Sequence, residues 1–133
     1  MAKRFVSGIV GAIIGAGIVW FLLPPPPPSA GPLVVGIYAT SDKTCDVQFP
    51  DVNLSWKRGD RIVWESLDNK YTIVFKPSGT CTNSGDPFGG IPIPVPANGK
   101  SQAQKPARKG DFCYEVQDGN GQTCDDPGLH VRD

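Results

Sequence analysis

Residues 59–75, GDRIVWESLDNKYTIVF, decide the fold of this chain. A turn sequence, Lys57–Asp60, leads into an apolar run, Arg61–Trp64, and a polar corner separates this run from a second one, Tyr71–Phe75. Both runs are rich in β-branched and aromatic residues and are bounded by turn-forming residues, which is typical of strands. The stretch therefore predicts two successive β-strands joined by a short polar connection.

Short apolar or alternating runs recur through the rest of the chain, separated by segments rich in Gly and Pro. The 133 residues include 16 Gly and 14 Pro and are long enough for one modest domain. No helical periodicity interrupts this pattern, so we predict an all-β, Greek-key β-sandwich over residues 33–133. Further strands are expected at Leu33–Ala39, Thr44–Phe49, Val52–Trp56, Ile91–Val95, Phe112–Gln117 and Gly128–Arg132.

Prolines refine two of these expectations. Pro50 interrupts the alternation between residues 44–49 and 52–56, which predicts one strand split by a kink, a feature that lets a strand change sheets. Prolines alternate with aliphatic residues in Ile91–Val95, and proline lacks the N–H that a central strand needs, so this run is an edge strand or an extended loop. The large core residues are expected to be Trp56, Trp64, Phe75, Phe112 and Tyr114.

An uncharged apolar run, Phe5–Leu23, precedes the β-rich part. At ~1.5 Å per residue it just spans a hydrocarbon core of ~30 Å, and the preceding Lys3 and Arg4 predict a cytoplasmic N-terminus. A cleaved secretory signal is the alternative, but the run is long for one, and its small-residue site, Pro28–Ala30, lies among prolines. We therefore predict a signal anchor over residues 1–23 in the inner (cytoplasmic) membrane, with a periplasmic domain.

Ser7, Gly11 and Gly15 recur at intervals of four within the apolar run. Small residues at this spacing let a second membrane helix approach closely, although glycine is also common in membrane helices in general, and both interpretations stay open. Pro24–Pro28 then favours the polyproline II conformation. Residues 24–32 are expected to form a stiff, proline-rich linker between the single-pass anchor and the domain.

Four cysteines lie in the exported part, at Cys45, Cys81, Cys113 and Cys124, and none belongs to a CxxC pair. An even number in a small exported domain predicts two disulfides, whereas a zinc site would need closely spaced ligand pairs. The formal net charge is zero, so the chain lacks the strong basic excess expected of a nucleic-acid-binding protein.

Two blocks of the sequence resemble the cupredoxin family. In the first, residues 59–75, the family pattern reads Gly-Asp-x-Val-x-Trp-x-Asn, a few residues, His and an apolar strand. In the second, residues 110–131, the pattern is Gly-x-Tyr-x-Phe/Tyr-x-Cys, a short loop and a closing strand. The resemblance implies a cupredoxin-like Greek-key β-sandwich. The matching positions in the second block are Gly110, Phe112, Tyr114, Gly128, Leu129 and Val131.

The copper ligands of that family are not matched. Tyr71 stands where the first ligating histidine would be, and Val116 stands where the cysteine ligand would be. A blue-copper site needs two histidines and a thiolate, whereas this chain has one histidine, His130, and one methionine, Met1. The expectation is a domain without copper or any other cofactor.

The resemblance also implies how the cysteines pair, among the three connectivities that four cysteines allow. The loops at the lost copper end would hold Tyr71 together with Cys45 and Cys124, and the other two cysteines would lie at the opposite end. The pairing implied is therefore Cys45–Cys124 and Cys81–Cys113.

The loop of residues 118–126 is a second place where a metal could bind, because Asp118, Asn120, Asp125 and Asp126 carry side-chain oxygens. It lacks the glycine at the sixth position and the glutamate at the twelfth that an EF-hand requires. We interpret it as a glycine-rich turn closed by hydrogen bonds to Asp or Asn side chains.

No Ser/His/Asp arrangement and no GxSxG or HExxH motif indicates an enzyme, and no small-molecule substrate is indicated. We predict a non-catalytic accessory or structural subunit of a multi-subunit membrane complex, with respiratory and photosynthetic assemblies as candidate hosts. Phe88, Ile91 and Ile93 are the predicted partner contact; alternatively, their segment covers its own core. A free-standing cell-envelope binding domain is the first alternative, and a metal-handling or electron-transfer protein with a non-standard site is the second.

Overall fold

The two strands predicted within residues 59–75 form, and they belong to different sheets. β5 (Ile62–Ser66) lies in the smaller sheet and β6 (Tyr71–Phe75) lies in the larger one. Gly59, in the turn before β5, has a φ of 70°, a left-handed conformation that glycine adopts without steric cost. The polar corner between the two strands therefore carries the chain from one sheet to the other.

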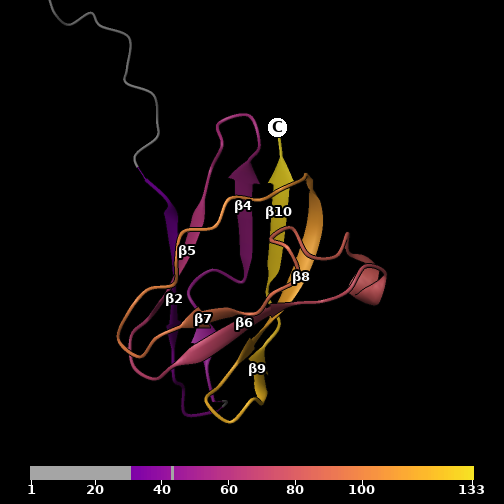
Figure 1. Cartoon of the computed structure of the whole chain (residues 1–133). Helices are drawn as coiled ribbons and strands as arrows, with labels where there is room; N and C mark the ends of the chain where they lie inside the picture. Colours follow the sequence, from indigo (N-terminus) through magenta and orange to yellow (C-terminus); the bar gives the residue numbers. More distant parts are fainter. Residues whose placement is uncertain (1–30, 43) are drawn as a thin grey trace, which may run out of the picture. The chain divides into compact units, whose positions relative to one another are not determined.

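The structure, a computed structural model, describes residues 31–42 and 44–133, which form an all-β unit (Figure 1). The only helical element among these residues is a short 3-10 turn, η1 (Thr80–Thr82). The other strands are β2 (Leu33–Tyr38), β3 (Asp46–Val47), β4 (Asp51–Ser55), β7 (Ile93–Val95), β8 (Gly110–Gln117), β9 (Thr123–Asp125) and β10 (Gly128–Arg132).

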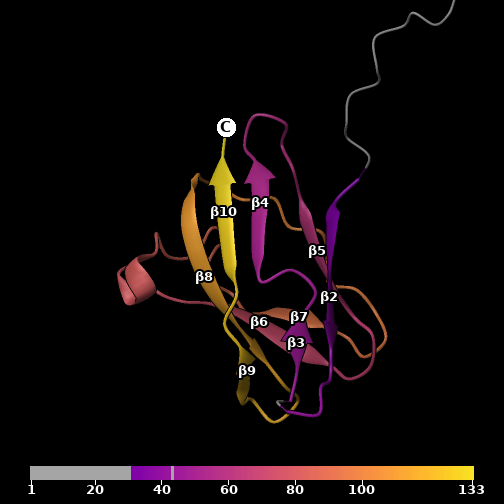
Figure 2. The same ribbon diagram turned by 180° about the vertical axis from the view of Figure 1, so that it is seen from behind.

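Two sheets make up the unit, and Figures 1 and 2 show them from opposite sides. The smaller sheet has the order β3-β2-β5, in which β2 runs parallel to β5 and antiparallel to β3. The larger sheet has the order β4-β10-β8-β6-β7, and β9 pairs with β8. β7 pairs only with β6 and so forms an edge, as its prolines predict.

The predicted kink at Pro50 is confirmed, because the strands on its two sides join different sheets. β3 pairs with β2 in the smaller sheet, where Val47 faces Ile37. β4 pairs with β10 in the larger sheet, and the Pro50 carbonyl accepts a hydrogen bond of 2.8 Å from the N–H of Gly128. One short segment therefore couples both sheets.

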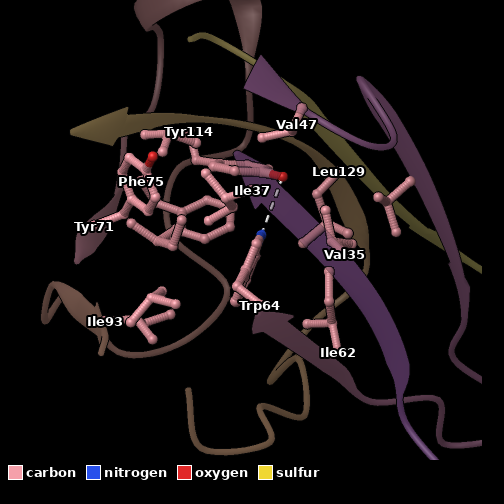
Figure 3. Close-up of a cluster of buried hydrophobic side chains, with 14 of the residues drawn as sticks. Val35, Ile37, Val47, Ile62, Trp64, Tyr71, Phe75, Ile93, Tyr114 and Leu129 are labelled. Atoms are coloured by element: carbon pink, nitrogen blue, oxygen red, sulfur yellow. Dashed lines mark hydrogen bonds between the residues drawn. The ribbon is translucent and has the colours of Figure 1, made fainter. Parts of the chain in front are cut away.

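A hydrophobic core fills the space between the two sheets (Figure 3). Trp64 from the smaller sheet is fully buried, and its indole N–H donates a hydrogen bond of 3.2 Å to the hydroxyl of Tyr114 from the larger sheet. The Trp64 ring packs edge-on against Phe75 and Phe88, with centroid distances of 6.3 and 6.2 Å. This aromatic cluster joins the two sheets and the loop that carries Phe88.

Trp56 was wrongly predicted as a core residue, because its side chain is 39% exposed. β4 ends at Ser55, and Trp56 begins a turn in which its carbonyl accepts a 3.0 Å hydrogen bond from the N–H of Gly59. The alternation of inward and outward side chains stops where the strand stops. The other expected large core residues are buried: Trp64, Phe75, Phe112 and Tyr114.

Two further strand predictions need correction. The predicted strand at residues 44–49 is reduced to the two residues of β3, because only these residues pair with β2 in regular register. Residues 118–126 were predicted as a loop throughout, but they contain β9, which pairs with β8 around a register shift at Val116 and Gln117.

The predicted anchor at residues 1–23, with its small residues Ser7, Gly11 and Gly15, lies outside the described residues, as does most of the linker at 24–32. Within residues 31–42 and 44–133, no helix has the length and apolar character needed to cross a membrane.

Candidate functional site

Tyr71 lies at the end of the domain where the resemblance would place copper. Its side chain is buried, and its hydroxyl donates a hydrogen bond of 2.7 Å to Oδ1 of Asp68. The other carboxylate oxygen of Asp68 accepts a 2.7 Å bond from the N–H of Ala39, and Oδ1 accepts a 2.6 Å bond from the N–H of Asn69. Asp68, which the sequence did not single out, thus ties Tyr71 to the segment after β2.

The protonation of this pair follows from its surroundings. Burial, reinforced by the hydrogen bond to Asp68, raises the pKa of Tyr71 to about 12. Burial also acts to raise the pKa of Asp68, but the hydrogen bonds from Ala39, Tyr71 and Asn69 outweigh it, and the pKa of Asp68 lies below its usual value. At neutral pH, Tyr71 is a protonated donor and Asp68 is an ionised acceptor. The pair therefore forms a hydrogen bond within the domain that links Tyr71 to the β5–β6 corner.

We expect the Tyr71→Phe variant to lose less stability at alkaline pH than the wild-type protein. The folded-state pKa of Tyr71 is raised, so its contribution to stability is complete below pH 10 and is lost as the pH rises towards 12. Urea unfolding at pH 9 and at pH 11.5 gives the free energy of unfolding at each pH. The decrease between the two pH values should be smaller in the variant than in the wild type by about 1–2 kcal/mol. Equal losses in the two proteins would contradict this assignment.

The residues at this end do not fit a blue-copper centre. Val116, at the position where the resemblance would place the cysteine ligand, is fully buried, and its carbonyl oxygen lies 3.3 Å from Sγ of Cys124. This sulfur is bonded to that of Cys45 in the Cys45–Cys124 disulfide, so neither of the two is a thiolate. Among the described residues, no three His, Cys, Asp or Glu side chains are grouped in a way that could hold a metal ion.

The two disulfides have the connectivity that the resemblance implies. Cys45–Cys124, with a Cα separation of 5.3 Å, joins the residue before β3 in the smaller sheet to β9 in the larger sheet. β3 and β9 lie side by side at the lower end of Figure 2. Cys81–Cys113, with a Cα separation of 7.1 Å, joins η1 to β8.

His130 lies on the outer face of β10 between two carboxylates. Its Nδ1 is 2.8 Å from Asp111 on β8, and its Nε2 is 3.2 Å from Asp51 on β4. Arg132 also binds Asp111, and the hydrogen bonds from His130 and Arg132 hold the pKa of Asp111 below its usual value. His130 is therefore part of a hydrogen-bonded network of side chains across three neighbouring strands.

The loop after β8 is a closed turn, as interpreted from its sequence. Oδ1 of Asp118 accepts hydrogen bonds from the N–H groups of Asn120 and Gln122, at 2.8 and 3.1 Å. Asp125 accepts a bond of 3.2 Å from the N–H of Val47, and Asp126 forms an ion pair of 2.8 Å with Lys76. Each of these carboxylates is already bonded within the domain.

A groove of about 510 Å³ runs along the edge of the larger sheet. One wall is mostly apolar and the other is mostly polar. The apolar wall consists of Phe88, Ile91, Pro92, Ile93, Pro94 and Pro96, and the polar wall consists of Lys100, Ser101, Gln102 and Gln104.

Backbone hydrogen bonds to β5 position the polar wall. Ile62 and Gln104 exchange N–H to carbonyl bonds of 3.0 and 2.9 Å. Ser101 donates its N–H to the Trp64 carbonyl at 2.8 Å, and its side-chain oxygen accepts the N–H of Trp64 at 3.0 Å. The sequence does not predict this pairing with β5 through a run of apolar residues, because the bonds are made by backbone groups and by one buried serine.

The three predicted contact residues differ in how far their side chains are exposed to solvent. Ile93 is 6% exposed and belongs to the core, which corrects its assignment as a contact residue. Phe88 is partly buried and packs against Trp64 and Phe75. Ile91 is 73% exposed, the largest exposed fraction among the large hydrophobic residues described. The segment therefore covers its own core with Phe88 and Ile93 and presents Ile91 outward.

Auracyanin A is among the solved structures that are similar to this chain. Auracyanin A, a blue copper protein from the green thermophilic photosynthetic bacterium Chloroflexus aurantiacus, has a TM-score of 0.46 and 10% sequence identity, over 76% of this chain and 99% of that chain. No protein-family model matches the chain, and no curated protein matches it. Copper is a property of auracyanin A. At the two positions where the sequence resemblance would place ligands, this chain has Tyr71 and Val116.

Proposed function

We propose that this chain is a non-catalytic binding subunit, a cupredoxin-like sandwich without copper that is held at the inner membrane. The anchor at residues 1–23 would fix it in the membrane, the linker at 24–32 would carry the domain on the periplasmic side, and the domain would contact other subunits of a membrane complex. The proposal combines the apolar N-terminal run with a domain whose metal-ligand positions hold an apolar residue and a bonded tyrosine.

The observation that carries the proposal is Ile91 at the rim of the groove. Its side chain is 73% exposed beside Pro92 and Pro94, while the neighbouring Ile93 is already used by the core. Burying an exposed isoleucine against a partner contributes about 1.5–3 kcal/mol, which makes it a suitable anchor for a contact. The polar wall opposite, with Lys100 and Gln102, supplies hydrogen-bonding groups for the rim of such an interface.

Purification of the intact, tagged protein in mild detergent, with mass spectrometry of the co-eluting proteins, tests the proposal. We expect recovery in a fixed stoichiometry with a set of membrane proteins. Recovery of the chain alone would favour the first alternative, a free-standing domain of the cell envelope. A metal-dependent absorption band in the purified protein would favour the second alternative, a metal-handling or electron-transfer protein.

Ile91→Asp is expected to lower the recovery of the partner proteins by roughly tenfold, because it places a charge where an apolar side chain would be buried. Leu67→Asp is the matched control, since Leu67 is also an exposed aliphatic residue, at 59%, but lies in the β5–β6 corner and does not line the groove. The same co-purification, quantified against the tagged chain, measures both variants. Equal losses in the two variants, or no loss with Ile91→Asp, would refute the groove as the contact.

A further inference from the structure

The two disulfides differ in how far solvent reaches them. Cys45 is fully buried and Cys124 is 9% exposed, and both belong to the hydrophobic core. Cys81 is exposed and Cys113 is half-buried on β8. Thiol–disulfide exchange requires direct approach of a thiolate to one sulfur, so access alone favours reaction at Cys81.

The backbone around Cys81 adds a second difference. Cys81 and Thr82 have φ angles of 54° and 56°, the left-handed region that residues with a side chain rarely adopt. η1 buries none of its residues, so no core contact holds the chain in this conformation. Opening the bond to Cys113 would let both residues relax without exposing apolar surface.

The structure around this turn is fixed by other bonds. The N–H of Ser84 donates to the Asp111 carbonyl at 2.7 Å, and the side-chain amide of Asn83 donates to the Lys76 carbonyl at 3.0 Å. Further along, the N–H of Ala107 donates to the Pro87 carbonyl at 2.8 Å. Opening of the disulfide is therefore confined to the few residues around η1 and leaves the two sheets and the groove in place.

We propose that Cys81–Cys113 is a thiol–disulfide exchange site that accepts electrons from a dithiol at the domain surface, while Cys45–Cys124 is a fixed structural bond. A thiolate of the dithiol attacks Sγ of Cys81, forms a mixed disulfide and releases the Cys113 thiolate. The second thiol of the dithiol then attacks the mixed disulfide and releases Cys81. One disulfide is lost and one is formed, and two electrons and two protons pass from the dithiol to the two cysteines. This proposal does not depend on the function proposed above.

The rate of reduction is the first test, and the second disulfide is its internal control. The full-length protein in mild detergent is treated with dithiothreitol at pH 7, quenched at intervals and alkylated, and peptide mass spectrometry follows each cysteine. We expect Cys81 and Cys113 to become labelled at least about tenfold faster than Cys45 and Cys124, because access limits the attack on a disulfide. Equal rates, or faster labelling of the core pair, would overturn the proposal.

Equilibrium and site selectivity distinguish an exchange site from a merely accessible bond. In mixtures of reduced and oxidised glutathione, Cys81–Cys113 should become half-reduced under conditions in which Cys45–Cys124 remains oxidised. A thioredoxin lacking its second active-site cysteine should trap a mixed disulfide at Cys81. A Cys81–Cys113 bond that stays oxidised in every glutathione mixture, or a mixed disulfide that forms at Cys113, contradicts the proposal.

Near-ultraviolet circular dichroism of the reduced protein tests whether the opening is local. The spectrum should keep the signal of the buried aromatic residues, and loss of this signal would contradict the local opening.

Discussion

Trp64→Ala is expected to lower the free energy of unfolding by about 3–5 kcal/mol, the usual cost of removing a large aromatic side chain from a core. Trp64 is fully buried and contacts the rings of Phe75, Phe88 and Tyr114. The variant would also leave the buried Tyr114 hydroxyl without its indole partner. Guanidinium unfolding of the two proteins with their disulfides intact measures the difference.

Trp56→Ala is the matched control for this prediction, because it removes the same side chain from an exposed position. Trp56 is 39% exposed and lies beyond the end of β4, so the change in unfolding free energy should stay within about 0.5 kcal/mol. A loss of several kcal/mol with Trp56→Ala, or a loss below 1 kcal/mol with Trp64→Ala, would show that the core has been wrongly located.

The double variant Cys45→Ala/Cys124→Ala is expected to lose about 2–5 kcal/mol of stability, the usual range for removal of a native disulfide from a small exported domain. These cysteines are 79 residues apart in sequence, and their bond joins the two sheets within the core. The unfolded chain therefore gains much conformational freedom, and the core loses two sulfur atoms. Thermal unfolding followed by circular dichroism tests the prediction.

Cys81→Ala/Cys113→Ala provides the comparison. Its loop of 32 residues is shorter, and the entropic model gives it a contribution smaller by about 1 kcal/mol. No core contact is lost at η1, which buries no residue. The melting temperature should therefore be highest for the wild type, lower for Cys81→Ala/Cys113→Ala and lowest for Cys45→Ala/Cys124→Ala. The reverse order of the two variants would refute the structural role given to Cys45–Cys124.

Local patterns predicted most of the fold. β5 and β6 followed from their β-branched and aromatic residues, and the change of sheet followed from Pro50, because a proline within an alternating run marks a break. Trp56 could not be placed by the same reasoning, since whether a strand ends at residue 55 or 56 depends on its partner strand. β9 was missed because its pairing with β8 lies across a turn rich in glycine.

The candidate sites were less visible in the sequence. The loss of the ligand pattern at Tyr71 and Val116 could be recognised, but the role of Asp68 depends on the meeting of two loops, which no local pattern encodes. Ile91 is exposed and Ile93 is buried, although both lie in the same apolar run, so the sequence alone could not tell which of them is available to a partner. The polar wall of the groove is positioned by backbone bonds to β5, and backbone bonds carry no sequence signature.

The prolines of β7 restrict the way in which another protein can bind at this edge. N–H groups of alternate residues point to opposite sides of a strand, and β7 pairs with β6 through a segment in which Ile93 and Val95 alternate with Pro92, Pro94 and Pro96. The N–H groups left for the open side would be those of the prolines, which have none. A foreign strand would find carbonyl acceptors there but no donors. A protein that binds here must recognise side chains, and extension of the sheet by a strand from another molecule, including a second copy of this chain, is disfavoured at this edge.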